Sequence, residues 1–248
     1  MTRMSTTTTL HLTTHELHAL ADALDAPGLW GVPVPPDAPE PTPGTDPLAG
    51  LVTRGLLEPD DAGSLWPSVD LGALVEAVAT HRVCVLVEQT ATTAGPGPRT
   101  VHAVLAGGTG LVRHRLGEPV HTFVLDAGSA DRLADTLVAL VEPAPGDGRP
   151  GTRRFRGRFG ALADLVPEPA GGWRRCSVLL RADGTDGRSR VDGLLAVLDA
   201  GPDRLWLVRE YDGPELDEGG PAVVAEPATA AEVTAALHAL ALHAEPGP

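Results

Sequence analysis

The chain has 248 residues, 42% of them hydrophobic, with 29 glycines, 24 prolines and a formal net charge of −14. A chain of this length and hydrophobic content can bury one or two ordinary cores, which excludes a wholly disordered protein. The net negative charge repels phosphate backbones and anionic lipid heads, so nucleic acid is not an expected partner.

The first residues carry no signal for export. Residues 1–9 hold one arginine and a run of threonines without an apolar segment. No stretch of the chain approaches the roughly 18 apolar residues that span a bilayer. We therefore expect a cytoplasmic protein that does not insert into a membrane.

The spacing of apolar residues predicts three helices in the first third of the chain, over 14–25, 48–57 and 69–80. The first of them follows a capping box, in which Thr13 and Glu16 each satisfy the other's backbone amide. Eight prolines within residues 27–47 predict an extended surface loop, because proline lacks the amide donor that helices and ladders need.

Short apolar runs bounded by turn residues then predict four strands, at 83–88, 100–106, 111–116 and 120–125. The sequence Gly107-Gly108-Thr109-Gly110 is typical of a hairpin turn between two of them. A phosphate loop is not expected there, because the chain contains no lysine and a strand pattern follows the glycines. Ser129 then begins an amphipathic helix that places Leu133, Leu137, Leu140 and Val141 on one face.

The segment 143–157 is rich in turn residues and arginine, and we interpret it as a basic linker. After it the pattern returns, with a short helix at 159–166 and four strands at 175–180, 191–198, 204–211 and 221–225. A last helix starts at Thr229, which forms a second capping box with Glu232.

Both halves therefore predict a short helix, four strands and a capped closing helix. Cys84 and Cys176 lie on the first strand of each half, in apolar runs typical of small core side chains. We infer an internal duplication with halves at 10–142 and 158–243, and an α+β fold with a mainly antiparallel sheet, because hairpin-length connections exclude parallel crossovers. Two independent α+β lobes are the alternative.

No cluster in the sequence supplies a nucleophile, a base and an orienting group together. Three histidines near the amino terminus suggest a metal site, but one helix supplies too few ligands: His11, His15 and His18. Four others lie on or beside predicted strands, where structural or solvated roles are favoured: His81, His102, His114 and His121. We expect no catalytic residue, no metal and no cofactor, and an interaction protein becomes the leading class.

Several segments of the sequence resemble the EspG family of type VII (ESX) secretion-associated proteins of actinobacteria. They are Leu12-Thr13-Thr14-His15-Glu16-Leu17-His18-Ala19-Leu20, the later Leu51-Val52-Thr53-Arg54-Gly55-Leu56-Leu57, the strand pairs, Trp206 and the Ala/Leu-rich last helix. The resemblance covers roughly residues 10 to 243 and implies a single EspG-like domain over 1–248, with a central antiparallel sheet, flanking helices and a quasi-two-fold relation between halves.

The resemblance also implies a function: a cytosolic chaperone that binds a helical secretion substrate of the PE/PPE type, covers its hydrophobic tip and delivers it to the export machinery. Family contacts come from the central sheet with its hairpin and from the carboxy-terminal helical region. Carried over to this chain, they predict partner-binding residues in the 100–116 hairpin and the last helix: Leu111, Arg113, Arg115 and Leu237.

The sequence is also compatible with two other functions. One is a small metal- or histidine-dependent hydrolase that uses His15 and His18. The other is a dimerisation module, in which the chain forms a homo-oligomer without any client.

Overall fold

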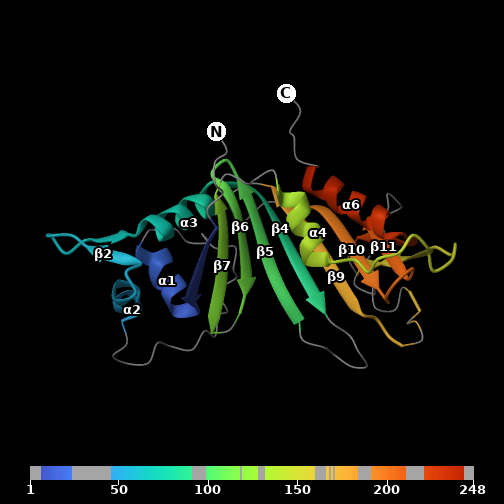
Figure 1. The fold of residues 1–248 in the computed structure, drawn as a ribbon, viewed down its shortest axis with the longest axis horizontal. Helices are drawn as coiled ribbons and strands as arrows, with labels where there is room; N and C mark the ends of the chain where they lie inside the picture. The colour runs from blue at the N-terminus through green and yellow to red at the C-terminus, as the bar shows by residue number, and fades with distance from the viewer. Residues whose placement is uncertain are drawn as a thin grey trace. The chain divides into compact units, whose positions relative to one another are not determined.

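The computed structural model describes residues 7–23, 46–90, 99–117, 119–127, 132–159, 166–167, 169, 171–183, 191–210 and 221–242. They form an α+β fold in which ten strands are hydrogen-bonded in series (Figure 1). The described residues belong to two compact units. The first draws on Met1–Cys84 and His102–Ala130, and the second on Val85–Val101, Asp131–Asp183 and Arg190–Pro248.

One series of five strands runs in the order β4, β5, β6, β7, β1. Their bounds are His81–Thr90, Arg99–Gly107, Gly110–Leu116, Val120–Ala127 and Thr7–Thr13. β7 pairs antiparallel with β6 on one side and with β1 on the other. The predicted hairpin turn is confirmed, since only Gly108 and Thr109 separate β5 from β6.

A second series runs in the order β9, β10, β11, β12, β8. Their bounds are Arg175–Asp183, Val191–Asp199, Leu205–Glu210, Ala222–Ala228 and Phe155–Arg158. All four pairings within this series are antiparallel.

The two series have the same order of elements. In each, four consecutive strands are followed by a helix, α4 (Leu133–Val141) after β7 and α6 (Ala230–Leu242) after β12, and an earlier segment supplies the fifth strand. This order confirms the predicted α+β class with a large antiparallel sheet. The division into halves at 10–142 and 158–243 stays a prediction, and the compact units group α4 with the strands of the second series.

The structure differs from the sequence predictions at both outer strands. β1 lies where no strand is predicted, and β8 lies at the end of the predicted linker 143–157, where it pairs with β12. Their sequences, TTTLHLT and FRGR, contain few apolar residues. An outer strand has a neighbour on one side only, so its sequence shows little of the apolar pattern that identifies inner strands.

Smaller differences concern the segment before α3 (Val69–Ala79). α2 (Pro47–Thr53) is shorter than the predicted helix 48–57, because Gly55 adopts a left-handed φ of 67° that ends it. β2 (Leu57–Pro59) and β3 (Leu65–Pro67) then form an unpredicted two-stranded sheet. Most of the loop 27–47, most of the predicted helix 159–166 and the capping residue Ser129 lie outside the described residues.

In the first unit, α1 (Thr14–Ala23), α2 and α3 cover one face of the strands. The first capping box is confirmed: the Thr13 amide donates to Glu16 Oε2 at 2.8 Å, and the Glu16 amide donates to Thr13 Oγ1 at 3.2 Å. Glu16 also accepts from Arg54 at 2.6 Å, which ties α1 to the end of α2. Buried side chains from the helices and strands form one apolar cluster, which includes Leu12, Leu17, Leu20, Leu51, Leu71, Leu74 and Phe123.

In the second unit, α6 packs against α4 and β10. Its capping box is also confirmed, because the Thr229 amide donates to Glu232 at 2.9 Å and the Glu232 amide donates to Thr229 Oγ1 at 3.2 Å. Leu137 of α4 and Val233 and Leu237 of α6 are fully buried. This helix pair therefore covers part of one face of the second series of strands.

The β5–β6 turn provides a test of packing in the first unit. A Cβ added at Gly107 would lie 2.8 Å from the Thr80 carbonyl oxygen and 2.9 Å from His81 Cα, whereas one added at Gly108 would meet nothing within 4 Å. We expect Gly107→Ala to lower the free energy of unfolding by about 1–3 kcal/mol, and Gly108→Ala to change it by less than about 0.5 kcal/mol. Urea denaturation of both variants checks this, and equal effects would contradict it.

Candidate functional site

The strands of the first unit have one face under the helices and one face without a helix of that unit. Cross-strand partners share a face, because side chains alternate along each strand. Arg113 pairs with Val124, which pairs with Thr9, and Arg115 pairs with Thr122, which pairs with His11. The intervening residues point to the helices, since Val112, Phe123 and Leu10 belong to the apolar cluster. Antiparallel sheets tolerate one polar face of this kind.

We call the outer residues of β1, β6 and β7, together with His102 of β5, the open sheet face. They are Thr7, Thr9, His11, Leu111, Arg113, Arg115, Val120, Thr122, Val124 and Asp126. Arg115 and Thr9 are exposed, and 43% of Val120 is exposed, whereas Arg113, Thr122 and Val124 are half-buried. Two cross-strand hydrogen bonds order its edge, Thr7 to Asp126 at 2.6 Å and His11 to Thr122 at 3.2 Å.

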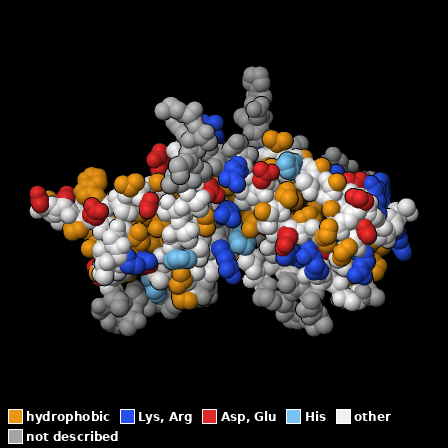
Figure 2. Space-filling view, in the orientation of Figure 1, with side chains coloured by type: hydrophobic (Ala, Val, Ile, Leu, Met, Phe, Trp, Pro, Cys, Tyr) orange, Lys and Arg blue, Asp and Glu red, His pale blue; other side chains and the backbone are white. Residues whose placement is uncertain are grey.

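The open sheet face is basic in an acidic protein. Arg113 and Arg115 lie two residues apart on β6, and Asp126 is the one carboxylate among the described residues of this face. Figure 2 shows arginine and histidine side chains together over β5 and β6. Burial first, and then the charges of Arg115 and Arg113, lower the pKa of His102. A surface with this charge is complementary to an acidic partner.

The four predicted partner-binding residues have different surroundings. Arg113 and Arg115 share the open sheet face, as their spacing predicts, and the Nε atom of Arg113 is buried without a hydrogen-bond partner among the described residues. Leu111 is 1% exposed and Leu237, in α6 of the second unit, is 0% exposed. These two leucines therefore present no exposed area to a partner.

Two buried histidines lie on the opposite, helix-covered side of the same strands. His114 Nε2 is 3.0 Å from His121 Nδ1, and His121 Nε2 is 3.2 Å from Thr14 Oγ1 at the start of α1. The ring of His114 stacks on Phe123 with centroids 4.1 Å apart. Burial first, and then His121 and His102, lower the pKa of His114 to about 3. These contacts make His114 and His121 part of the core, in agreement with the structural role favoured by the sequence.

The other residues with possible chemistry are dispersed. His11 lies on β1, whereas His15 and His18 lie on α1. Within the part of the chain that the structure describes, no group of three or more His, Cys, Asp or Glu side chains is arranged to hold a metal ion. Burial raises the pKa of both cysteine thiols, Cys84 and Cys176, to about 11. Both are therefore protonated and poor nucleophiles at neutral pH.

Three arginines of the predicted linker 143–157 contact other residues of this chain. Arg149 forms an ion pair with Glu232 of α6, and Arg154 forms one with Glu226 of β12 at 3.0 Å. Arg153 lies over the ring of Phe155 at 4.9 Å. The two ion pairs hold the segment against α6 and β12 within the second unit.

Comparison with known proteins gives a match in structure and none in sequence. No protein-family model and no curated protein matches the chain. A solved structure of the Mycobacterium tuberculosis type VII secretion system chaperone EspG5 in complex with a PE25–PPE41 dimer aligns with 97% of this chain and 98% of that one, with a TM-score of 0.59 and 11% identity. None of the described helices is long and apolar enough to cross a membrane. The chain has an EspG-like fold.

The buried His114 predicts how stability depends on pH. In the unfolded chain His114 takes up a proton as the pH falls below its ordinary pKa of 6.5, whereas in the folded protein it does so only near its lowered pKa of about 3. The unfolded state therefore binds more protons in this window, and the free energy of unfolding falls as the pH is lowered, by at most about 1.4 kcal/mol per pH unit from this group. We expect His114→Phe, which keeps a ring against Phe123, to flatten this slope. Urea denaturation in this pH range measures it, and an unchanged slope would contradict the prediction.

Proposed function

We propose that this protein is a cytoplasmic chaperone or adaptor that binds a helical substrate of a type VII (ESX) secretion system, keeps it soluble and delivers it for export. The observation that carries the proposal is the fold shared along nearly the whole of both chains with a type VII secretion chaperone bound to a PE25–PPE41 dimer. A binding role, rather than catalysis, accords with that likeness, with the packing of His114 and His121 into the core, and with the separate positions of His11 on β1 and of His15 and His18 on α1.

The open sheet face supplies the contacts that such a role needs. Val120 and Val124 offer apolar area beside the long aliphatic stems of Arg113 and Arg115. An exposed apolar end of a helical client would be covered by this area, which removes a surface that otherwise promotes aggregation. The guanidinium groups are also complementary to acidic side chains and to the partial negative charge at the carboxy-terminal end of a helix. The proposed client surface is therefore an apolar helix end with acidic residues around it.

The test of the proposed function is co-expression with small helical secreted proteins encoded near its gene. We expect one of them to be insoluble alone and to form a stable complex with this protein on gel filtration, whose stoichiometry light scattering then gives. If every such candidate elutes apart from this protein and its solubility does not change, the chaperone proposal fails. Self-association that persists with and without candidate clients would favour the dimerisation module instead.

A matched pair of charge reversals tests whether the open sheet face is the docking surface. Arg115 is exposed on the open sheet face. Arg82 is exposed on β4 and lies on the same face of that strand as Cys84, which packs against the apolar cluster on the helix-covered side. We expect Arg115→Glu to weaken the client complex by at least about tenfold, because it places like charges together, and Arg82→Glu to leave the affinity nearly unchanged. Titration calorimetry with the purified client measures both, and equal effects would contradict this assignment.

A further inference from the structure

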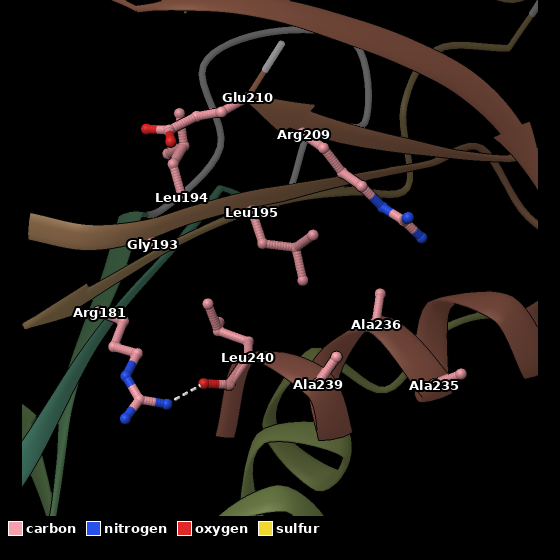
Figure 3. A pocket seen from close by; sticks show the side chains of 10 residues that line it. All are labelled: Arg181, Gly193, Leu194, Leu195, Arg209, Glu210, Ala235, Ala236, Ala239 and Leu240. Carbon is pink, nitrogen blue, oxygen red and sulfur yellow. Dashed lines mark hydrogen bonds between the residues drawn. The ribbon is translucent and has the colours of Figure 1, made fainter. Parts of the chain in front are cut away.

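A cavity of about 510 Å³ that is open to solvent lies between α6 and the strands β9, β10 and β11, within the second unit (Figure 3). Its apolar wall is formed by one leucine of β10 and by small or apolar residues of α6: Leu195, Ala236, Ala239 and Leu240. Its basic groups are Arg181 of β9 and Arg209 of β11. Cavities of roughly 300–1,000 Å³ with apolar walls and a few polar groups are typical of small-molecule sites.

Arg181 forms a fixed part of the wall. Its side chain is 1% exposed and donates hydrogen bonds to the carbonyl oxygens of Leu240 and, at 3.0 Å, of Ala241 in the last turn of α6. The carboxy-terminal end of a helix carries partial negative charge, which stabilises a buried guanidinium there. This contact holds α6 at its distance from β9 and places a positive charge at one end of the cavity.

Arg209 lies at the other end and is available to a ligand. It is exposed, it is the cross-strand partner of Leu195, and no hydrogen bond or ion pair engages its side chain within the described part of the chain. Neighbouring arginines differ in this respect, since Arg149 and Arg154 are paired with glutamates. Arg209 also lines a neighbouring pocket with Glu226 and Glu232, and its charge contributes to the lowered pKa of Glu232.

The one carboxylate among the lining residues faces away from the cavity. Figure 3 shows the side chains of Leu194 and Glu210 on the side of the strands opposite to α6, and those of Leu195 and Arg209 on the side of α6. The interior is thus apolar along its length, with positive charge at both ends and no negative side chain among the described residues that point into it.

We propose that this cavity binds a small carboxylate with an apolar body. The carboxylate accepts hydrogen bonds from the guanidinium of Arg209, and the body lies along Leu195, Ala236 and Leu240. A guanidinium and a carboxylate form charge-assisted and often bidentate hydrogen bonds, and the apolar wall removes the hydrocarbon from water. The inference is independent of the client complex, because the open sheet face lies in the first unit and the cavity in the second.

The experiment uses the full chain and two probes of equal length, octanoate and 1-octanol, in titration calorimetry. We expect octanoate to bind at least about tenfold more tightly than octanol, because only the carboxylate is charged and can form a bidentate ion pair with Arg209. Absence of octanoate binding, or equal affinity for the two probes, would overturn the proposal.

Three variants test whether the probes bind in the cavity beside α6. Arg209→Gln should weaken octanoate by about tenfold and leave octanol unchanged. Ala239→Leu, at an exposed position of α6 where leucine is a good helix former, should fill the cavity and weaken both probes. Arg115→Glu, on the open sheet face, should change neither. Unchanged octanoate binding in both Arg209→Gln and Ala239→Leu would overturn the assignment. If Arg209→Gln does not fold, octanoate binding to Ala239→Leu alone tests the site, and unchanged binding there overturns the assignment.

Discussion

The register of β1 with β7, and of β7 with β6, is the constraint on which the first unit depends. It places Leu10, Phe123 and His114 on the side of the helices and Thr9, Val124 and Arg113 on the other. A shift of one residue would exchange the two sets, so that arginine would face the core and phenylalanine would face water. The cost of burying an unpaired guanidinium makes such a shift very unfavourable. The same register that builds the core therefore also builds the open sheet face.

In the second unit, polar side chains from the strands hold the ends of both helices. Arg175 donates to the Val141 carbonyl at 2.9 Å and Gln89 donates to the Leu140 carbonyl at 2.8 Å, at the end of α4. Arg181 does the same at the end of α6. These carbonyls have no partner within their own helix, so each contact satisfies an acceptor and offsets the negative end of the helix dipole. Positioning α6 in this way also determines the width of the cavity beside it.

Arginine has an unusual range of roles in this protein because the chain contains no lysine. Arg181 is buried against helix carbonyls, Arg54 pairs with the buried carboxylate of Glu16, and Arg115 and Arg209 are exposed beside apolar side chains. The planar guanidinium tolerates all of these settings, since it remains charged and forms several hydrogen bonds in fixed directions. The exposed pair supplies charge to the two surfaces for which we propose ligands, one for a helical protein and one for a small carboxylate.

Elements whose signals are local could be predicted from the amino-acid sequence. Three kinds of signal were sufficient to identify elements: the capping boxes at Thr13 and Thr229, the helical spacing of 69–80, and the turn at Gly108 and Thr109. Each involves residues that are close together in the chain, so no tertiary contact is needed to recognise it. The repeated order of strands and helices followed from them, and with it the fold class. Tertiary structure alone decided the outer strands β1 and β8, because their partners lie far away in the chain, as Thr13 and Val120 illustrate.

Tertiary structure also decided which predicted residues are accessible. Alternation along β6 correctly places Leu111, Arg113 and Arg115 on one face, but it cannot say that Leu111 is covered while Arg115 is not. The cavity beside α6 could not be predicted from the sequence either, because its lining comes from four separate elements: Arg181, Leu195, Arg209 and Ala236. Local sequence patterns indicate which side chains share a face of a strand or helix. Burial of that face depends on what packs against it from elsewhere in the chain.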